Sequence, residues 1–123
     1  MKQLLFVFLG GGIGSVLRFL ISKTLNPTFQ SFYLGTFIVN IVGSLLIGLI
    51  LGLTLKNNYF TQNQILFLAV GFCGGFTTFS TFAFENYSLL KNGDLINFAM
   101  YTILSIATGI IAIMAGLWLS KTF

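Results

Sequence analysis

Residues 71–82 read GFCGGFTTFSTF and lie in the middle of an apolar segment long enough to span a membrane. Three glycines fall within residues 71–75, which makes a poor helix, and four small hydroxyl residues follow within residues 77–81. Hydrocarbon offers no water to a broken backbone, so irregular chain at that depth is tolerated only where it is buried in protein or lines a hydrated cavity. We therefore predict that the helix is interrupted across residues 71–78. The backbone groups freed by such a break can hold ions, which indicates an ion pathway.

The composition places the chain among membrane proteins. Its 123 residues are 56% hydrophobic and 7% charged, with a mean hydropathy of +0.97, whereas soluble domains carry about 25% charged residues. There is no histidine, and the single cysteine, Cys73, excludes an intrachain disulfide and a cysteine-based metal cluster. We expect no enzyme, because the sequence offers no base–nucleophile or metal-ligand set. The six Lys and Arg residues are scattered rather than clustered, which argues against nucleic-acid binding.

Four segments are long and apolar enough to span a membrane, at about residues 3–22, 33–55, 65–90 and 98–119. We predict an all-α membrane protein with a single four-span domain over residues 1–123, whose third helix is broken in mid-membrane. The connections are short and polar, and the first of them ends at Pro27. The first segment is interpreted as a span rather than a signal peptide, because it contains a glycine cluster and no Ala-x-Ala-like cleavage site.

An even number of spans puts both termini on one side, and the cations divide almost equally between the two sides. They are Lys2, Lys56 and Lys121 beside the termini, against Lys23, Lys91 and Arg18. Cytoplasmic loops normally carry a clear excess of Lys and Arg, so either one or two charges decide the orientation or copies insert both ways up. A unit this small encloses little interior, so a polar cavity favours a second copy. Two opposed copies form a dimer with its two-fold axis in the membrane plane.

Small and polar residues mark the first two spans. Gly-x-x-x-Gly matches at residues 10–14 and 48–52 predict close helix packing. Arg18 either extends to interfacial water or pairs with an acid or a helix C-terminus. Asn40 either hydrogen-bonds between helices or lines a pore.

Rings and hydroxyls alternate in the third span. Phenylalanines recur at helical spacing at positions 72, 76, 79 and 82. In an intact helix such a stripe is usually packed in a core or against lipid, but beside a break ring edges favour an anion and ring faces a cation. Glu85 follows one turn after Phe82 and is either interfacial or functional. In the fourth span Tyr101, Ser105 and Thr108 share one helix face, which indicates either interhelical hydrogen bonds or a polar track.

The chain resembles the Fluc/CrcB family of bacterial fluoride channels. The resemblance is carried by GGGIGSVLR at residues 10–18, GTFIVNIVGS at 35–44 and above all GFCGGFTTFSTF at 71–82, and it covers essentially the whole chain. It implies an antiparallel, dual-topology homodimer in the bacterial plasma (inner) membrane. Two pores at the dimer interface then let cytoplasmic fluoride leave passively.

The resemblance also implies a set of site residues. A structural Na⁺ on the two-fold axis is held by the backbone carbonyls of Gly74 and Thr77 from both subunits. The implied pore residues are the edge-on rings Phe79 and Phe82, the vestibule residue Asn40, the polar track Tyr101 and Ser105, and the further donors Ser80, Thr81 and Thr108. Gly109 stands where a further hydroxyl is expected. Arg18 and Glu85 match family positions without an assigned role.

The main alternative is a small multidrug-resistance-type, proton-coupled cation exporter, which shares the four spans, the length and the dual topology. Such exporters need a membrane-embedded carboxylate in the first span. Here that span has no acid, and Glu85 lies in the third. A non-transporting membrane assembly factor or regulator has no need for Asn40, the hydroxyl stripe and the broken helix together.

Overall fold

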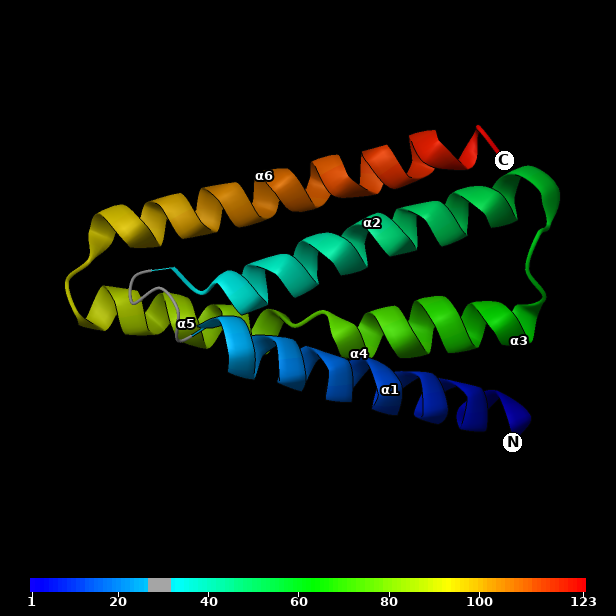
Figure 1. Cartoon of the computed structure of the whole chain (residues 1–123), viewed down its shortest axis with the longest axis horizontal. Helices are drawn as coiled ribbons and strands as arrows, with labels where there is room; N and C mark the ends of the chain where they lie inside the picture. Colours follow the sequence, from blue (N-terminus) through cyan, green and yellow to red (C-terminus); the bar gives the residue numbers. More distant parts are fainter. Residues whose placement is uncertain (27–31) are drawn as a thin grey trace.

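The chain forms four long helical rods that lie side by side (Figure 1). The computed structural model describes residues 1–26 and 32–123, so Pro27 of the first connection lies outside the described residues. The elements are α1 (Lys2–Leu25), α2 (Leu34–Asn57), the third rod composed of α3 (Gln62–Ile65), η2 (Leu66–Cys73), α4 (Gly74–Phe76) and α5 (Phe79–Lys91), and α6 (Leu95–Ser120). All four rods are long and apolar enough to cross a membrane. The four predicted spans are confirmed as helices, each end to within three residues.

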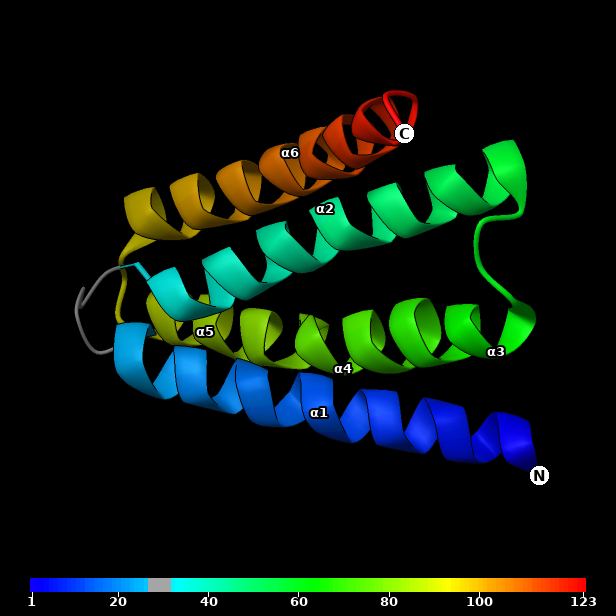
Figure 2. The same cartoon turned by 45° about the vertical axis from the view of Figure 1, so that its right-hand side comes forward.

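Both termini lie at the same end of the bundle, as an even number of spans predicts (Figures 1 and 2). The connection from α2 to α3 shares that end, and the turn from α5 to α6 lies at the other. Along the bundle α1 packs on η2 and α4, while α2 packs on α6. The third rod begins with a capping box, in which Thr61 and Gln64 satisfy each other's backbone N–H groups.

Close backbone approach explains the predicted glycine pairs. A β-carbon on Gly10 or Gly14 would collide with main-chain atoms of the third rod. On α2, a β-carbon on Gly48 would collide with the Ile113 carbonyl, and one on Gly52 with the Ser120 side chain. Helices without bulky side chains at the interface gain van der Waals contact along their length. The packing prediction for both Gly-x-x-x-Gly matches is confirmed.

The predicted extent of the break is wrong. Residues 66–73 wind as a π-helix and 74–76 as an α-helix, so the glycines are helical. Only Thr77 (ψ 158°) and Thr78 (φ −150°, ψ 121°) are extended. The physical reason is tertiary packing: Gly71 and Gly75 lie against the main chain of α1, where a β-carbon would collide. Close packing therefore outweighs the low helix propensity of glycine.

Candidate functional site

The threonines at the break satisfy part of the exposed backbone themselves. Thr78 precedes α5, and its Oγ1 accepts a hydrogen bond of 3.2 Å from the N–H of Thr81, which is an N-cap. The Thr77 hydroxyl donates to the Cys73 carbonyl at 2.9 Å. The end of α4 and the start of α5 are therefore both closed by hydroxyl groups.

Asn40 of α2 clamps the extended backbone from the side. Its Oδ1 accepts from the N–H of Thr78 at 2.8 Å, and its Nδ2 donates to the Thr78 carbonyl at 3.2 Å. One amide thus replaces the helical acceptor that the N–H of Thr78 loses at the break and adds a second hydrogen bond to the Thr78 carbonyl. One turn along α2, Gly43 leaves space for the methyl group of Thr77. The interhelical role of Asn40, one of its two predicted alternatives, is confirmed.

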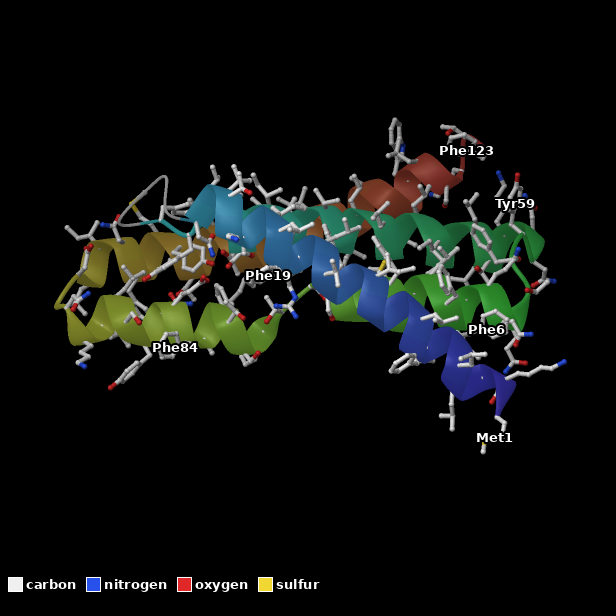
Figure 3. The ribbon with its side chains drawn as sticks, turned by 60° about the horizontal axis from the view of Figure 1, so that its bottom comes forward. Met1, Phe6, Phe19, Tyr59, Phe84 and Phe123 are labelled. Carbon is white, nitrogen blue, oxygen red and sulfur yellow. The ribbon has the colours of Figure 1, made fainter. Side chains whose placement is uncertain are left out.

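Arg18 reaches the break from the other side. The first rod crosses the third beside the gap between α4 and α5 (Figure 3). Arg18 Nε donates to the Gly75 carbonyl at 2.9 Å, and Ser15 Oγ donates to the same oxygen at 3.5 Å. A cation is stabilised at a helix C-terminus, where unpaired carbonyls concentrate negative potential. The alternative in which Arg18 pairs with a helix C-terminus is therefore confirmed.

The carbonyl oxygens of Gly74 and Thr77 are among those left over at the break. In a continuous helix the N–H of Thr78 would bond to the Gly74 carbonyl, but it bonds to Asn40. The N–H of Thr81 would bond to the Thr77 carbonyl, but it bonds to Thr78 Oγ1. Within the described part of the chain, no turn or side-chain hydrogen bond ends on either carbonyl. Gly74 is also exposed, with no atom within 4 Å of the position of a β-carbon.

The break opens onto a groove of about 370 Å³ between the third rod, α2 and α6. Every lining residue is uncharged: Asn40, Gly43, Ser44, Ile47, Ala69, Cys73, Gly74, Thr77, Thr78, Phe79, Phe82, Ser105, Ile106 and Gly109. The Phe79 ring is 79% exposed. Its centroid lies 6.1 Å from that of Phe82, with the ring planes inclined by 49°. The groove therefore offers ring surfaces and neutral polar groups side by side.

Ser105 supplies an unused hydroxyl in this groove. Its Oγ is buried and has no hydrogen-bond partner among the described residues. A buried hydroxyl without a partner costs about 1–3 kcal/mol. This hydroxyl is therefore available to a water molecule or an ion in the groove.

Glu85 lies at the centre of a second polar cluster, outside the groove lining. Its side chain is 5% exposed. Oε2 accepts from Thr36 Oγ1 at 2.8 Å and from Asn26 Nδ2 at 3.3 Å, and Oε1 accepts from the Tyr101 hydroxyl at 2.8 Å. These neutral donors come from the end of α1, the start of α2 and the first half of α6. The carboxylate is thus buried between helices rather than interfacial.

A sequence model of the CrcB-like proteins, described as camphor resistance (CrcB), matches residues 5–117. The chain belongs to this family. With four helices able to cross a membrane, this membership identifies a multi-pass bacterial membrane protein.

Relatives in this family match over their full length. A fluoride-specific ion channel FluC of Gloeothece citriformis is 48% identical over 98% of this chain and 98% of its own. FluC of Bacteroides fragilis is 46% identical over 100% of this chain and 99% of its own. FluC of Azobacteroides pseudotrichonymphae is 42% identical over 100% of this chain and 99% of its own. These relatives are named as channels, which fits the expectation that the chain is no enzyme.

Only some of the residues that were predicted to form the CrcB-family site lie together in the structure. Those that line the groove together are Asn40, Gly74, Thr77, Phe79, Phe82 and Ser105. Ser80 is exposed beside the break, with its Oγ 3.4 Å from Thr78 Oγ1. The Thr108 hydroxyl donates to the Leu104 carbonyl of its own helix. Thr81 and Tyr101 lie outside the lining, and Tyr101 bonds to Glu85.

Sequence reasoning missed the partners of these buried polar groups. Asn26 was assigned to a connection, yet its side chain bonds to both Thr36 and Glu85. Asn86 of α5 donates to the Phe82 carbonyl at 3.1 Å and accepts from Thr102 of α6 at 3.0 Å. The sequence does carry a signal for such contacts, because amides and hydroxyls inside apolar spans must find hydrogen-bond partners.

Proposed function

We propose that this chain forms a passive, fluoride-selective channel through which cytoplasmic fluoride leaves the cell down its gradient. The observation that carries the proposal is the uncharged groove beside the helix break, in a chain whose full-length relatives are named fluoride-specific ion channels. Fluoride is small and strongly hydrated, so its path must replace water with closely spaced donors. The Ser105 hydroxyl and the edges of Phe79 and Phe82 are suited to that role.

The uncharged character of the described groove lining favours conduction. Conduction needs binding that is strong enough to admit the ion and weak enough to release it. A lysine or arginine in the path would hold a small anion too tightly. The charge of Arg18 is instead directed at the Gly75 carbonyl, where it stabilises the break.

The channel is proposed to be an antiparallel homodimer with two pores. The groove of one chain is open on one side, and Phe79 and Gly74 are exposed there. A second copy would close the groove and exclude lipid from its polar lining. The near-equal division of cations between the two sides supports insertion in both orientations.

A structural Na⁺ at the two-fold axis fits the free carbonyls at the break. The oxygens of Gly74 and Thr77 have lost their helical partners, and carbonyl oxygen is a suitable ligand for a hard cation. The Gly74 and Thr77 carbonyls of both subunits would hold the ion. When bound, it supplies positive charge that ties the half-helix ends of two subunits together.

Proton-coupled cation export is the weaker proposal. That chemistry needs a carboxylate that substrate and protons reach in turn. Glu85 is 5% exposed, engaged by three neutral side chains, and absent from the lining of the groove.

Anion efflux from liposomes tests the proposed function. With the proton gradient clamped, we expect rapid loss of fluoride and no loss of chloride, read with ion-selective electrodes. Phe79→Ile and Phe82→Ile should slow fluoride loss while the dimer remains intact, because isoleucine lacks a positive ring edge.

Phe84→Ile is the matched control, since Phe84 is 68% exposed on α5 and lies outside the groove lining. Equal fluoride efflux from all three variants would remove the rings from the mechanism. No fluoride efflux from folded wild-type protein would refute the channel itself.

Insertion in both orientations is a separate prediction. A protease-cleavable tag at the N-terminus should be cut in about half of the copies from either side of the membrane, because the Lys and Arg counts are nearly balanced. Replacing Asn57 and Asn58 with lysine adds two charges beside the termini and should shift the wild-type ratio towards one orientation. A tag that is reached from only one side in the wild type contradicts dual topology.

A further inference from the structure

A second cavity lies between the last turns of α2 and α6, at the end of the bundle that holds both termini. Its volume is about 440 Å³, and its lining is Gly52, Leu55, Lys56, Leu117, Ser120 and Lys121. Leu55 is 83% exposed and Leu117 is 36% exposed. The cavity therefore combines an accessible apolar wall with two lysine residues, at one end of the helices that are able to cross a membrane.

Both lysines of this cavity have N–H donors left for an anion. Lys56 Nζ donates to the Lys121 carbonyl at 2.9 Å, which holds this ammonium over the end of α6. An ammonium has three N–H donors, so two remain for another acceptor. Within the described residues, no hydrogen bond or ion pair engages the Lys121 ammonium.

No acidic side chain competes for these lysines. The chain has only two acidic residues. Glu85 is buried in its own cluster, and Asp94 caps the start of α6 at the opposite end of that helix. The carbonyls at a helix C-terminus repel an anion, but the Lys56 ammonium lies against the last carbonyls of α6 and offsets that potential.

We infer that this cavity binds the phosphate headgroup of an anionic phospholipid, with Lys56 and Lys121 on the phosphate and an acyl chain against Leu55 and Leu117. Basic pockets between membrane helices suit such headgroups, which present both a negative charge and an attached apolar chain. Trp118, 64% exposed on the last turn of α6, is a residue type that anchors helices at the interface. The inference does not depend on which ion the protein conducts.

Lipid binding to the purified full-length protein tests this inference. Phosphatidylglycerol or phosphatidylcholine is titrated into protein in neutral detergent, and retained lipid is measured by native mass spectrometry. We expect wild-type protein to prefer phosphatidylglycerol by roughly tenfold or more. Lys56→Gln/Lys121→Gln should lose this preference, and Lys56→Arg/Lys121→Arg should keep it.

The matched control is Lys23→Gln/Lys91→Gln, which removes two exposed lysines at the other end of the bundle. It should retain the preference, which supports a defined site. Equal losses in both Gln pairs would overturn the inference in favour of diffuse surface charge. Retention of the preference by Lys56→Gln/Lys121→Gln would also overturn it, as would inorganic phosphate that displaces the lipid at low millimolar concentration.

Discussion

Asn40→Ala should reduce fluoride efflux by at least about tenfold, because it leaves the N–H of Thr78 without a partner, at about 1–3 kcal/mol, and removes one bond from the Thr78 carbonyl. Asn40 makes two of the hydrogen bonds that hold the extended segment, at 2.8 and 3.2 Å. Without them the geometry of the break is held less firmly, and the carbonyls and rings on either side lose alignment. A population shift of about 1.4 kcal/mol is enough for a tenfold loss of the conducting conformation. Efflux from liposomes measures this effect.

Hydrogen exchange separates this effect from a direct role of the amide in the pore. If Asn40 acts through the break, Asn40→Ala should lower amide protection at Thr78 and in the first turn of α5. The matched control is Asn97→Ala, which removes an amide that bonds to Asp94 at the start of α6, outside the groove. Normal efflux together with unchanged amide protection in Asn40→Ala would contradict a role for Asn40 in holding the break.

The helices were predictable because the signal for a span is local. Each rod needs only about 20 consecutive apolar residues. The location of the break was not predictable in this way, because it depends on contacts between distant segments. Glycine propensity alone places it too early, whereas the structure keeps Gly71 and Gly75 helical against α1. The helix ends where Asn40, 38 residues away in sequence, competes for the backbone of Thr78.

The partners of the polar residues also depend on contacts between distant segments. The sequence indicates that Arg18 and Asn40 need partners, since membrane-embedded polar groups seldom remain alone. It does not identify the partners, because each alternative uses the same residue types. The cluster around Glu85 joins side chains 49 and 59 residues apart. Only the arrangement of the rods brings Thr36 and Asn26 to that carboxylate. It also pairs the Tyr101 hydroxyl with Glu85, which is the interhelical alternative for its helix face rather than the polar track.

Gly14→Val should strongly destabilise the folded protein, with a loss of about 3 kcal/mol or more in the free energy of unfolding. A β-carbon at this position collides with the Phe72 carbonyl and the Phe76 N–H, which are rigid main-chain atoms. The first and third rods would have to separate along their interface, and Arg18, one turn further along α1, would lose the Gly75 carbonyl. The measurement is the thermal unfolding midpoint of purified protein, together with the yield of monodisperse material.

Gly12→Val provides the matched control, since it makes the same substitution in the same helix. No atom lies within 4 Å of a β-carbon on Gly12. This variant should therefore unfold within about 2 °C of the wild type, while Gly14→Ala, which adds only one methyl group, should fall between the two. Equal unfolding midpoints for Gly12→Val and Gly14→Val would refute the close approach of α1 to the third rod. They would also remove the geometric basis for the contact between Arg18 and the break.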